Sequence, residues 1–113
     1  MLKDKIEEVL NRFKDVTFPE LLLRFPVEAP GDGVLYGDNE SLIIWEGFSE
    51  ACLDAIHSLV AEGKAELLAL SAVDAILAHA TVHKGGLSYP VAKRIQKYTR
   101  PHWMPAMLRL KRR

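Results

Sequence analysis

The side chains most suited to chemistry lie in the last quarter of the chain, where bases and aromatic rings alternate. Lysine and arginine pair with phosphate or carboxylate groups, and aromatic rings beside them offer faces for stacking. We expect Lys93, Arg94, Lys97 and Arg100 to contact phosphate, and Tyr98, His102 and Trp103 to stack or donate hydrogen bonds. The tail that follows adds more bases. The candidate binding set is Lys93, Arg94, Lys97, Tyr98, Arg100, His102, Arg109 and Lys111.

The charge of the chain is segregated along the sequence, although its net value is zero. Residues 1–74 contain all 15 acidic residues and 6 of the 15 bases, for a net charge of −9. The remaining 39 residues contain the other nine bases and no acid, for +9. Such asymmetry indicates a basic surface meant for an anionic partner. The alternatives are that the two parts neutralise each other within the domain or across a dimer, or that the late bases are simply solvated.

A metal site could be built around His79 and His83, because residues four apart on a helix share one face. The segment between them lacks the glutamate of the H-E-x-x-H zinc motif, and the residues that could complete a site are scattered. These are His57, His102 and Cys52. We therefore predict no metal and no cofactor, and expect Cys52 to be a buried thiol rather than a nucleophile.

No local pattern indicates an enzyme, since no Ser/His/Asp, Cys/His or paired-carboxylate arrangement can be recognised. The Pro101-His102-Trp103 segment is unusual in composition, and we assign it no mechanism. A single cysteine excludes an internal disulfide and, with no N-terminal signal pattern, indicates a reducing cytoplasmic setting. Asp74 interrupts the longest apolar run, so we expect a soluble protein that does not cross a membrane.

Periodic apolar positions predict the helices that would position these residues. A capping box of Thr17 and Glu20 marks the start of one helix, and Ser49 is suited to cap another that ends before Gly63. The apolar stripe of each helix is suited to burial. The predicted helices cover residues 2–14, 18–24, 49–62 and 71–80.

Shorter apolar runs predict strands between and after these helices. A turn at Gly37-Asp38-Asn39-Glu40 would join two of them in a hairpin, whereas Pro30–Gly33 is expected to be a loop. In the last strand, Met104, Ala106, Leu108 and Leu110 would face the core, and Trp103, Pro105, Met107 and Arg109 would face outward. The predicted strands cover residues 34–36, 42–45, 66–70, 87–92 and 103–110, and the last two flank the basic loop.

The order of these elements resembles that of a winged helix-turn-helix domain. The segment SLVAEGKAELLAL, residues 58–70, is similar to the end of a third helix that turns into the first wing strand. The resemblance implies one α+β, winged-helix-like domain over residues 1–113, with three to four helices and a small antiparallel sheet. That sheet would include a C-terminal basic hairpin.

The resemblance also implies a small non-enzymatic DNA-binding protein, such as a transcriptional regulator, with duplex DNA as the partner. The candidate recognition helix has an acidic exposed face, formed by Glu50, Asp54 and Glu62, which phosphates would repel. We therefore place the expected phosphate contacts on the basic hairpin and tail. The alternative function is a protein interaction or self-association module, acting as a homodimer or with a protein partner, on the same scaffold without DNA binding.

Overall fold

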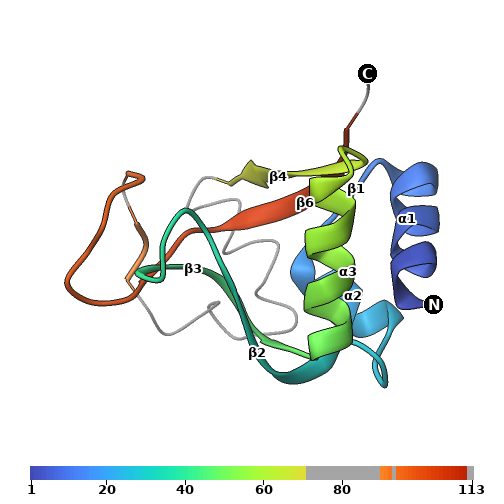
Figure 1. Cartoon of the computed structure of the whole chain (residues 1–113), viewed down its shortest axis with the longest axis horizontal. Coiled ribbons are helices and arrows are strands. Elements are labelled where there is room, and N and C mark those ends of the chain that lie inside the picture. The colour runs from blue at the N-terminus through green and yellow to red at the C-terminus, as the bar shows by residue number, and fades with distance from the viewer. Residues whose placement is uncertain (71–89, 93, 112–113) are drawn as a thin grey trace.

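The computed structural model describes residues 1–70, 90–92 and 94–111, and shows the α+β class that the sequence predicts. Within these ranges the chain forms three helices and two three-stranded sheets (Figure 1). The predicted helix 71–80, residues 87–89 of a predicted strand, and Lys93 lie outside the described residues. The elements are α1 (Leu2–Phe13), β1 (Asp15–Val16), α2 (Phe18–Arg24), β2 (Pro30–Tyr36), β3 (Leu42–Phe48), α3 (Glu50–Ala61), β4 (Ala65–Ala69), β5 (His102–Trp103) and β6 (Ala106–Leu110).

Helices α1 and α3 pack side by side through their apolar stripes (Figure 1). On α1 the buried residues recur every four positions, at Leu2, Ile6 and Leu10. On α3 they are Cys52, Ala55, Ile56 and Leu59, which join the same hydrophobic core. Polar side chains bridge the edge of this contact, where Lys3 pairs with Glu62 and Lys64 with Glu7. Both predicted helices are therefore confirmed, and amphipathic burial explains them.

The caps of α2 and α3 also form as predicted. The Thr17 hydroxyl accepts from the Glu20 backbone N–H at 3.3 Å, and the Thr17 N–H donates to the Glu20 carboxylate at 3.2 Å. The Ser49 hydroxyl accepts from the Cys52 N–H at 3.1 Å. After α3 the chain reverses at Gly63, whose φ of 73° is costly for other residues, and it then enters β4.

The two sheets differ in strand direction. The first sheet has the order β1-β6-β4 and is antiparallel throughout, as predicted for the strands that follow α3. The second sheet has the order β2-β3-β5, in which β2 and β3 form the predicted hairpin but β5 runs parallel to β3. The expectation of a single antiparallel sheet is therefore wrong, because the chain after Ala92 returns along β3 in the same direction.

The predicted C-terminal basic hairpin is not formed as an antiparallel pair within the described residues. Val91 bridges Trp103 in parallel, with the Trp103 N–H donating to the Pro90 carbonyl and the Ala92 N–H donating to the Trp103 carbonyl, both at 2.8 Å. The flanking segments therefore run side by side in the same direction. The basic residues between them lie on a longer connection, not on a tight hairpin turn.

The predicted strand 103–110 is divided at Met104 and Pro105 between the two sheets. Trp103, expected to face outward, is only 2% exposed, and Pro105 is also buried. The cause is that β5 turns its indole into the core beside β3, so the alternation restarts after Pro105, which has no N–H to pair. In β6 the prediction is confirmed for buried Ala106 and Leu108 and for exposed Arg109.

The Pro30–Gly33 segment, predicted to be a loop, is the first half of β2. Gly31 allows this pairing because the chain passes close to the junction of β3 and α3. A Cβ atom at Gly31 would lie 2.6 Å from the Ser49 Cα and 2.9 Å from the Phe48 carbonyl oxygen. The missing side chain is what brings β2 against the start of α3.

We predict that Gly31→Ala destabilises the domain by about 1–3 kcal/mol, because backbone atoms on the neighbouring segment must move to admit the methyl group. Urea unfolding followed by circular dichroism would measure the loss. Asp32→Ala, at the exposed next position, is the control and should change stability little. Equal stability of the Gly31→Ala protein and the parent would contradict the close approach described above.

Candidate nucleic-acid interface

Residues 94–102, hereafter the basic segment, lie at the end of the molecule away from α1 (Figure 1). The turn between β2 and β3 holds this segment in place. The Asn39 side-chain amide donates to the Gln96 carbonyl at 3.3 Å, and the Tyr98 N–H donates to the Ser41 hydroxyl at 2.9 Å. The His102 N–H donates to the Ser41 carbonyl at 2.7 Å. Two polar residues of one turn therefore position the segment at three points.

The turn itself is stabilised by local hydrogen bonds. The Asn39 side-chain carbonyl accepts from the Ser41 N–H at 2.9 Å and also contacts the Ser41 hydroxyl. This is the arrangement by which asparagine commonly fixes a turn. The sequence predicts a turn at this place, but it contains no signal that the turn also holds residues 57 positions later in the chain.

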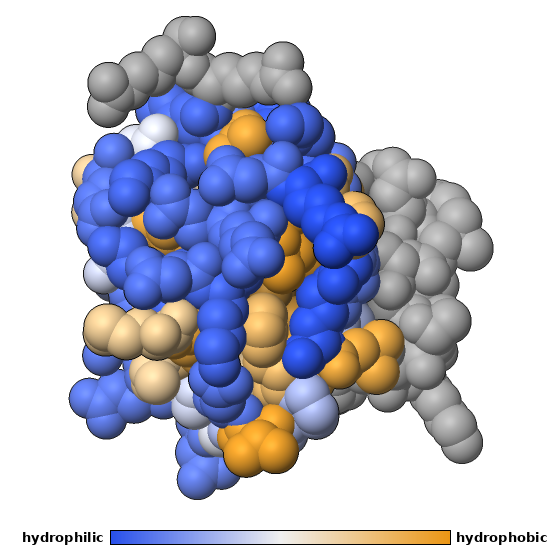
Figure 2. Space-filling model, turned by 90° about the vertical axis from the view of Figure 1, so that its right-hand side faces the viewer, coloured by the Kyte–Doolittle hydropathy of each residue, from blue (hydrophilic) through white to orange (hydrophobic). Residues whose placement is uncertain are grey.

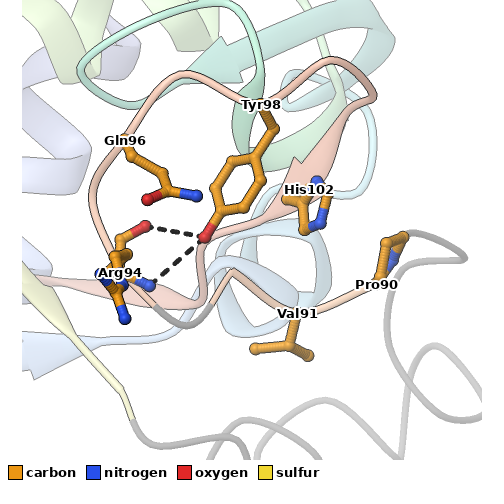
Figure 3. Close-up of a pocket in the computed structure, with 6 residues that line it drawn as sticks. All are labelled: Pro90, Val91, Arg94, Gln96, Tyr98 and His102. Atoms are coloured by element: carbon orange, nitrogen blue, oxygen red, sulfur yellow. Dashed lines mark hydrogen bonds between the residues drawn. The ribbon is translucent and has the colours of Figure 1, made fainter.

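Two rings of the basic segment stack on each other. The Tyr98 and His102 ring centroids are 3.8 Å apart, and the ring planes differ by 18°. The Tyr98 hydroxyl donates to the Arg94 carbonyl at 3.0 Å and accepts from the Arg94 N–H at 3.4 Å (Figure 3). The phenol therefore closes the segment on itself and fixes the backbone that carries Arg94.

The histidine ring is fixed by a second hydrogen bond. Its Nδ1 lies 2.8 Å from the Arg100 carbonyl oxygen. Because a carbonyl oxygen can only accept, this geometry assigns the proton to Nδ1 and leaves Nε2 as the nitrogen able to meet a ligand.

A pocket of about 460 Å³ opens beside the two rings. Figure 3 shows the rings on one side of it, with Val91 and Pro90 across from them and Arg94 at the edge. Its wall is therefore part aromatic, part aliphatic and part cationic. The lining residues are Pro90, Val91, Arg94, Gln96, Tyr98 and His102.

The structure brings five of the eight predicted binding residues together and separates two of them. Arg94, Lys97, Tyr98, Arg100 and His102 share the basic segment, and its three cations are exposed. Lys93 is outside the described residues, so its prediction stays untested. Arg109 and Lys111 lie at or beyond the far end of β6, and Arg109 is seven residues from His102, which is up to about 23 Å of chain at about 3.3 Å per residue.

Arg109 differs from the other predicted cations because acidic residues flank it. Its guanidinium donates to the Glu66 carboxylate through Nε at 3.0 Å, and Asp15 stands opposite it in β1. Its charge is therefore largely compensated within the first sheet. Phosphate binding by Arg109 would have to displace or share the Glu66 contact.

The ion pairs indicate how far the early acids neutralise the late bases. In the described ranges, the pairs Lys3–Glu62, Lys5–Glu28 and Lys64–Glu7 all join residues of the first 70. Arg109–Glu66 is the pair in these ranges that joins the two parts. Arg94, Lys97 and Arg100 form no ion pair with a described residue, although Asp38 and Glu40 belong to the turn that holds the segment.

The other chemical candidates do not form a site among the described residues. Cys52 is buried on α3, and burial raises the pKa of its thiol to about 12. In the ranges that the structure describes, no three His, Cys, Asp or Glu side chains converge as a metal site would require. His79 and His83 lie outside those ranges. Nor is any described helix long and apolar enough to cross a bilayer.

Comparison with known proteins adds no family to this geometry. No protein-family model matches the chain, and neither the curated proteins nor the solved structures yield a similar one.

We predict that Cys52 resists alkylation while the domain is folded. Its raised pKa keeps the thiol protonated at neutral pH, and only the thiolate reacts. Iodoacetamide at pH 8.5 should label the protein slowly in buffer and rapidly in urea. Since the folded state binds the thiol proton more tightly, stability should fall as the pH rises above 9.0, the ordinary value for the thiol. Rapid labelling of the folded protein would contradict this assignment.

Proposed function

We propose that this chain is a small, non-enzymatic, cytoplasmic DNA-binding protein of winged-helix type, which contacts the phosphate backbone through its basic segment. One observation carries the proposal. Arg94, Lys97 and Arg100 are exposed, form no ion pair with a described residue, and lie on a segment that Asn39 and Ser41 hold in place. Exposed positive charge on a positioned segment is what recognition of a phosphate backbone requires.

The order of the elements around the first sheet supports the winged-helix part of the proposal. Helix α3 turns at Gly63 into β4, and β4 pairs antiparallel with β6, as expected of a third helix and the first wing strands. The basic segment lies in the connection between β4 and β6, which is the position of a wing. The β2–β3 hairpin between α2 and α3 is an addition to that pattern.

The charge of α3 supports the wing, rather than the helix, as the contact. Glu50, Asp54 and Glu62 are exposed on this helix, and Lys3 pairs with Glu62. Duplex phosphates would be repelled by the uncompensated carboxylates. The helix therefore serves to pack the domain, and DNA meets the opposite end of the molecule.

We predict that Lys97→Ala/Arg100→Ala weakens binding to a blunt duplex and makes the logarithm of affinity less dependent on the logarithm of salt concentration. Each phosphate contact contributes about −0.9 to that slope, so the slope should become less steep by roughly 2. Fluorescence anisotropy with a labelled duplex between 50 and 200 mM salt would measure the affinity and its salt slope. Over this range a protein with about six phosphate contacts loses roughly 10³ in affinity, so the change is easy to detect.

The control is Lys5→Ala/Arg24→Ala, which removes the same charge from α1 and α2. It should leave the salt slope nearly unchanged, because these residues lie away from the basic segment. An equal loss in the two double variants would mean that net charge, not the basic segment, governs binding.

A second function is favoured by exposed apolar side chains around α1 and α2. Leu23 is 66% exposed, Val27 is 90% exposed and Phe13 is about half exposed. Figure 2 shows the face on the side of α1, where apolar side chains reach the surface between polar ones. Groups of exposed apolar residues are a common feature of protein contact surfaces. The alternative is therefore a self-association or protein interaction module without DNA binding.

This alternative predicts a molecular mass that rises with concentration and no DNA affinity even at low salt. Light scattering during size-exclusion chromatography would measure the mass across a range of loading concentrations. Leu23→Ser/Val27→Ser should then abolish the rise, because it removes the apolar contact surface. A monomer at all concentrations that binds duplex DNA would exclude it.

A further inference from the structure

The pocket beside the basic segment has the chemistry of a site for one nucleotide. Its volume of about 460 Å³ lies within the range of small-molecule sites. The Tyr98 and His102 rings form an aromatic wall, and Val91 and Pro90 form an aliphatic one. A flat aromatic ligand is the kind of group that fits between two such walls.

The aromatic wall is fixed before any ligand arrives. The Tyr98 ring is held through both hydrogen bonds of its hydroxyl to the Arg94 backbone, and the His102 ring through Nδ1 and the Arg100 carbonyl. The rings already stack at 3.8 Å between centroids. Little side-chain entropy remains to be lost, so a third ring can extend the stack at low cost.

The polar groups at the edge of the pocket suit the rest of a nucleotide. The Arg94 guanidinium can form two parallel hydrogen bonds with a phosphate. The Gln96 amide has both donors and an acceptor, which suits the edge of a base. The His102 Nε2 is the ring nitrogen left to hydrogen-bond a ligand, since Nδ1 is engaged.

A base within a duplex cannot use this pocket, because its neighbours cover both of its faces. Only a base outside the helical stack can lie against a protein ring. We therefore infer that the pocket binds one unpaired nucleotide, with its base on the outer face of the His102 ring, which Tyr98 backs from the other side, and its phosphate on Arg94. This inference rests on the proposed DNA-binding function and names the ligand more closely, as DNA with a single-stranded end.

The experiment compares three probes by fluorescence anisotropy with the full chain. They are a blunt duplex, the same duplex with four unpaired dT nucleotides at its 3′ end, and the same with four at its 5′ end. At least one overhang should bind about tenfold more tightly than the blunt duplex, which is the order of effect expected from stacking one base. Competition with free thymidine monophosphate tests whether the pocket takes a nucleotide within DNA or a free one. Thymidine monophosphate at the same concentration as the overhang probe should not displace that probe.

Two substitutions at one position separate stacking from other effects. His102→Ala removes the ring and should reduce the overhang advantage, which is the ratio of overhang affinity to blunt-duplex affinity, to about onefold. His102→Phe keeps a flat ring and should retain most of the advantage. Circular dichroism of both variants checks that the fold is intact.

The outcomes distinguish this inference from the function on which it rests. Binding of all three probes with equal affinity by the parent protein would overturn the nucleotide site and leave the proposed DNA binding in place. Equal loss of the advantage in His102→Ala and His102→Phe would overturn the stacking role. Efficient displacement by free thymidine monophosphate would overturn the single-stranded end as the ligand. Absence of binding to every probe would overturn both proposals.

Discussion

Burial of the Trp103 indole against β3 is the interaction on which the placement of the candidate site depends. The ring is 2% exposed, and its Nε1–H donates to the Ile44 carbonyl at 3.1 Å. Burial of this indole contributes as much hydrophobic free energy as burial of several CH₂ groups. The hydrogen bond to Ile44 satisfies the indole N–H, which is its polar group. With the ring in this position, the backbone on either side of Trp103 must follow β3. The Met104 N–H accordingly donates to the Ile43 carbonyl, and the His102 N–H to the Ser41 carbonyl.

From this anchor, one segment of chain serves both sheets. Before Trp103 the chain pairs with β3 of the second sheet, and after Pro105 it becomes β6, the central strand of the first. Because Pro105 lacks an N–H, neither ladder can continue through it, and the change of sheet occurs there. The Leu70 N–H donates to the Pro105 carbonyl at 2.9 Å, which ties the end of β4 to the same point. The basic segment is thus attached to a rigid junction, and not to a free hairpin.

Features set by neighbouring residues could be predicted from the sequence, and features set by distant contacts could not. Thr17 and Glu20 specify the start of α2 through contacts within a few residues. Ser49 specifies the start of α3, and Gly63 its end, in the same local way. The direction of Trp103 depends on which strand it meets, and alternation alone assigned it to solvent. Pro30–Gly33 has the composition of a loop, and becomes a strand only because the Ser49 backbone lies against Gly31.

In the candidate site, too, the sequence predicted what depends on neighbouring residues and missed what depends on distant contacts. Grouping the bases by sequence identified the residues that meet in the basic segment, because they are close along the chain. The same grouping included Arg109, which the first sheet places between Glu66 and Asp15. It also omitted Asn39 and Ser41, whose side chains hold the segment from another part of the chain. Charge alone could not reveal these two, since neither residue carries any.

A net charge of zero constrains how this chain would approach DNA under the proposed function. At long range the negative and positive parts cancel, so the molecule gains little steering toward a polyanion from its overall charge. Within a Debye length, about 8–10 Å at physiological salt, the local field counts instead. There the exposed cations of the basic segment would attract phosphate, while the carboxylates of α3 would repel it from the other end. For the proposed DNA binding, this separation of charge favours an orientation in which the basic segment faces the nucleic acid and α3 faces water.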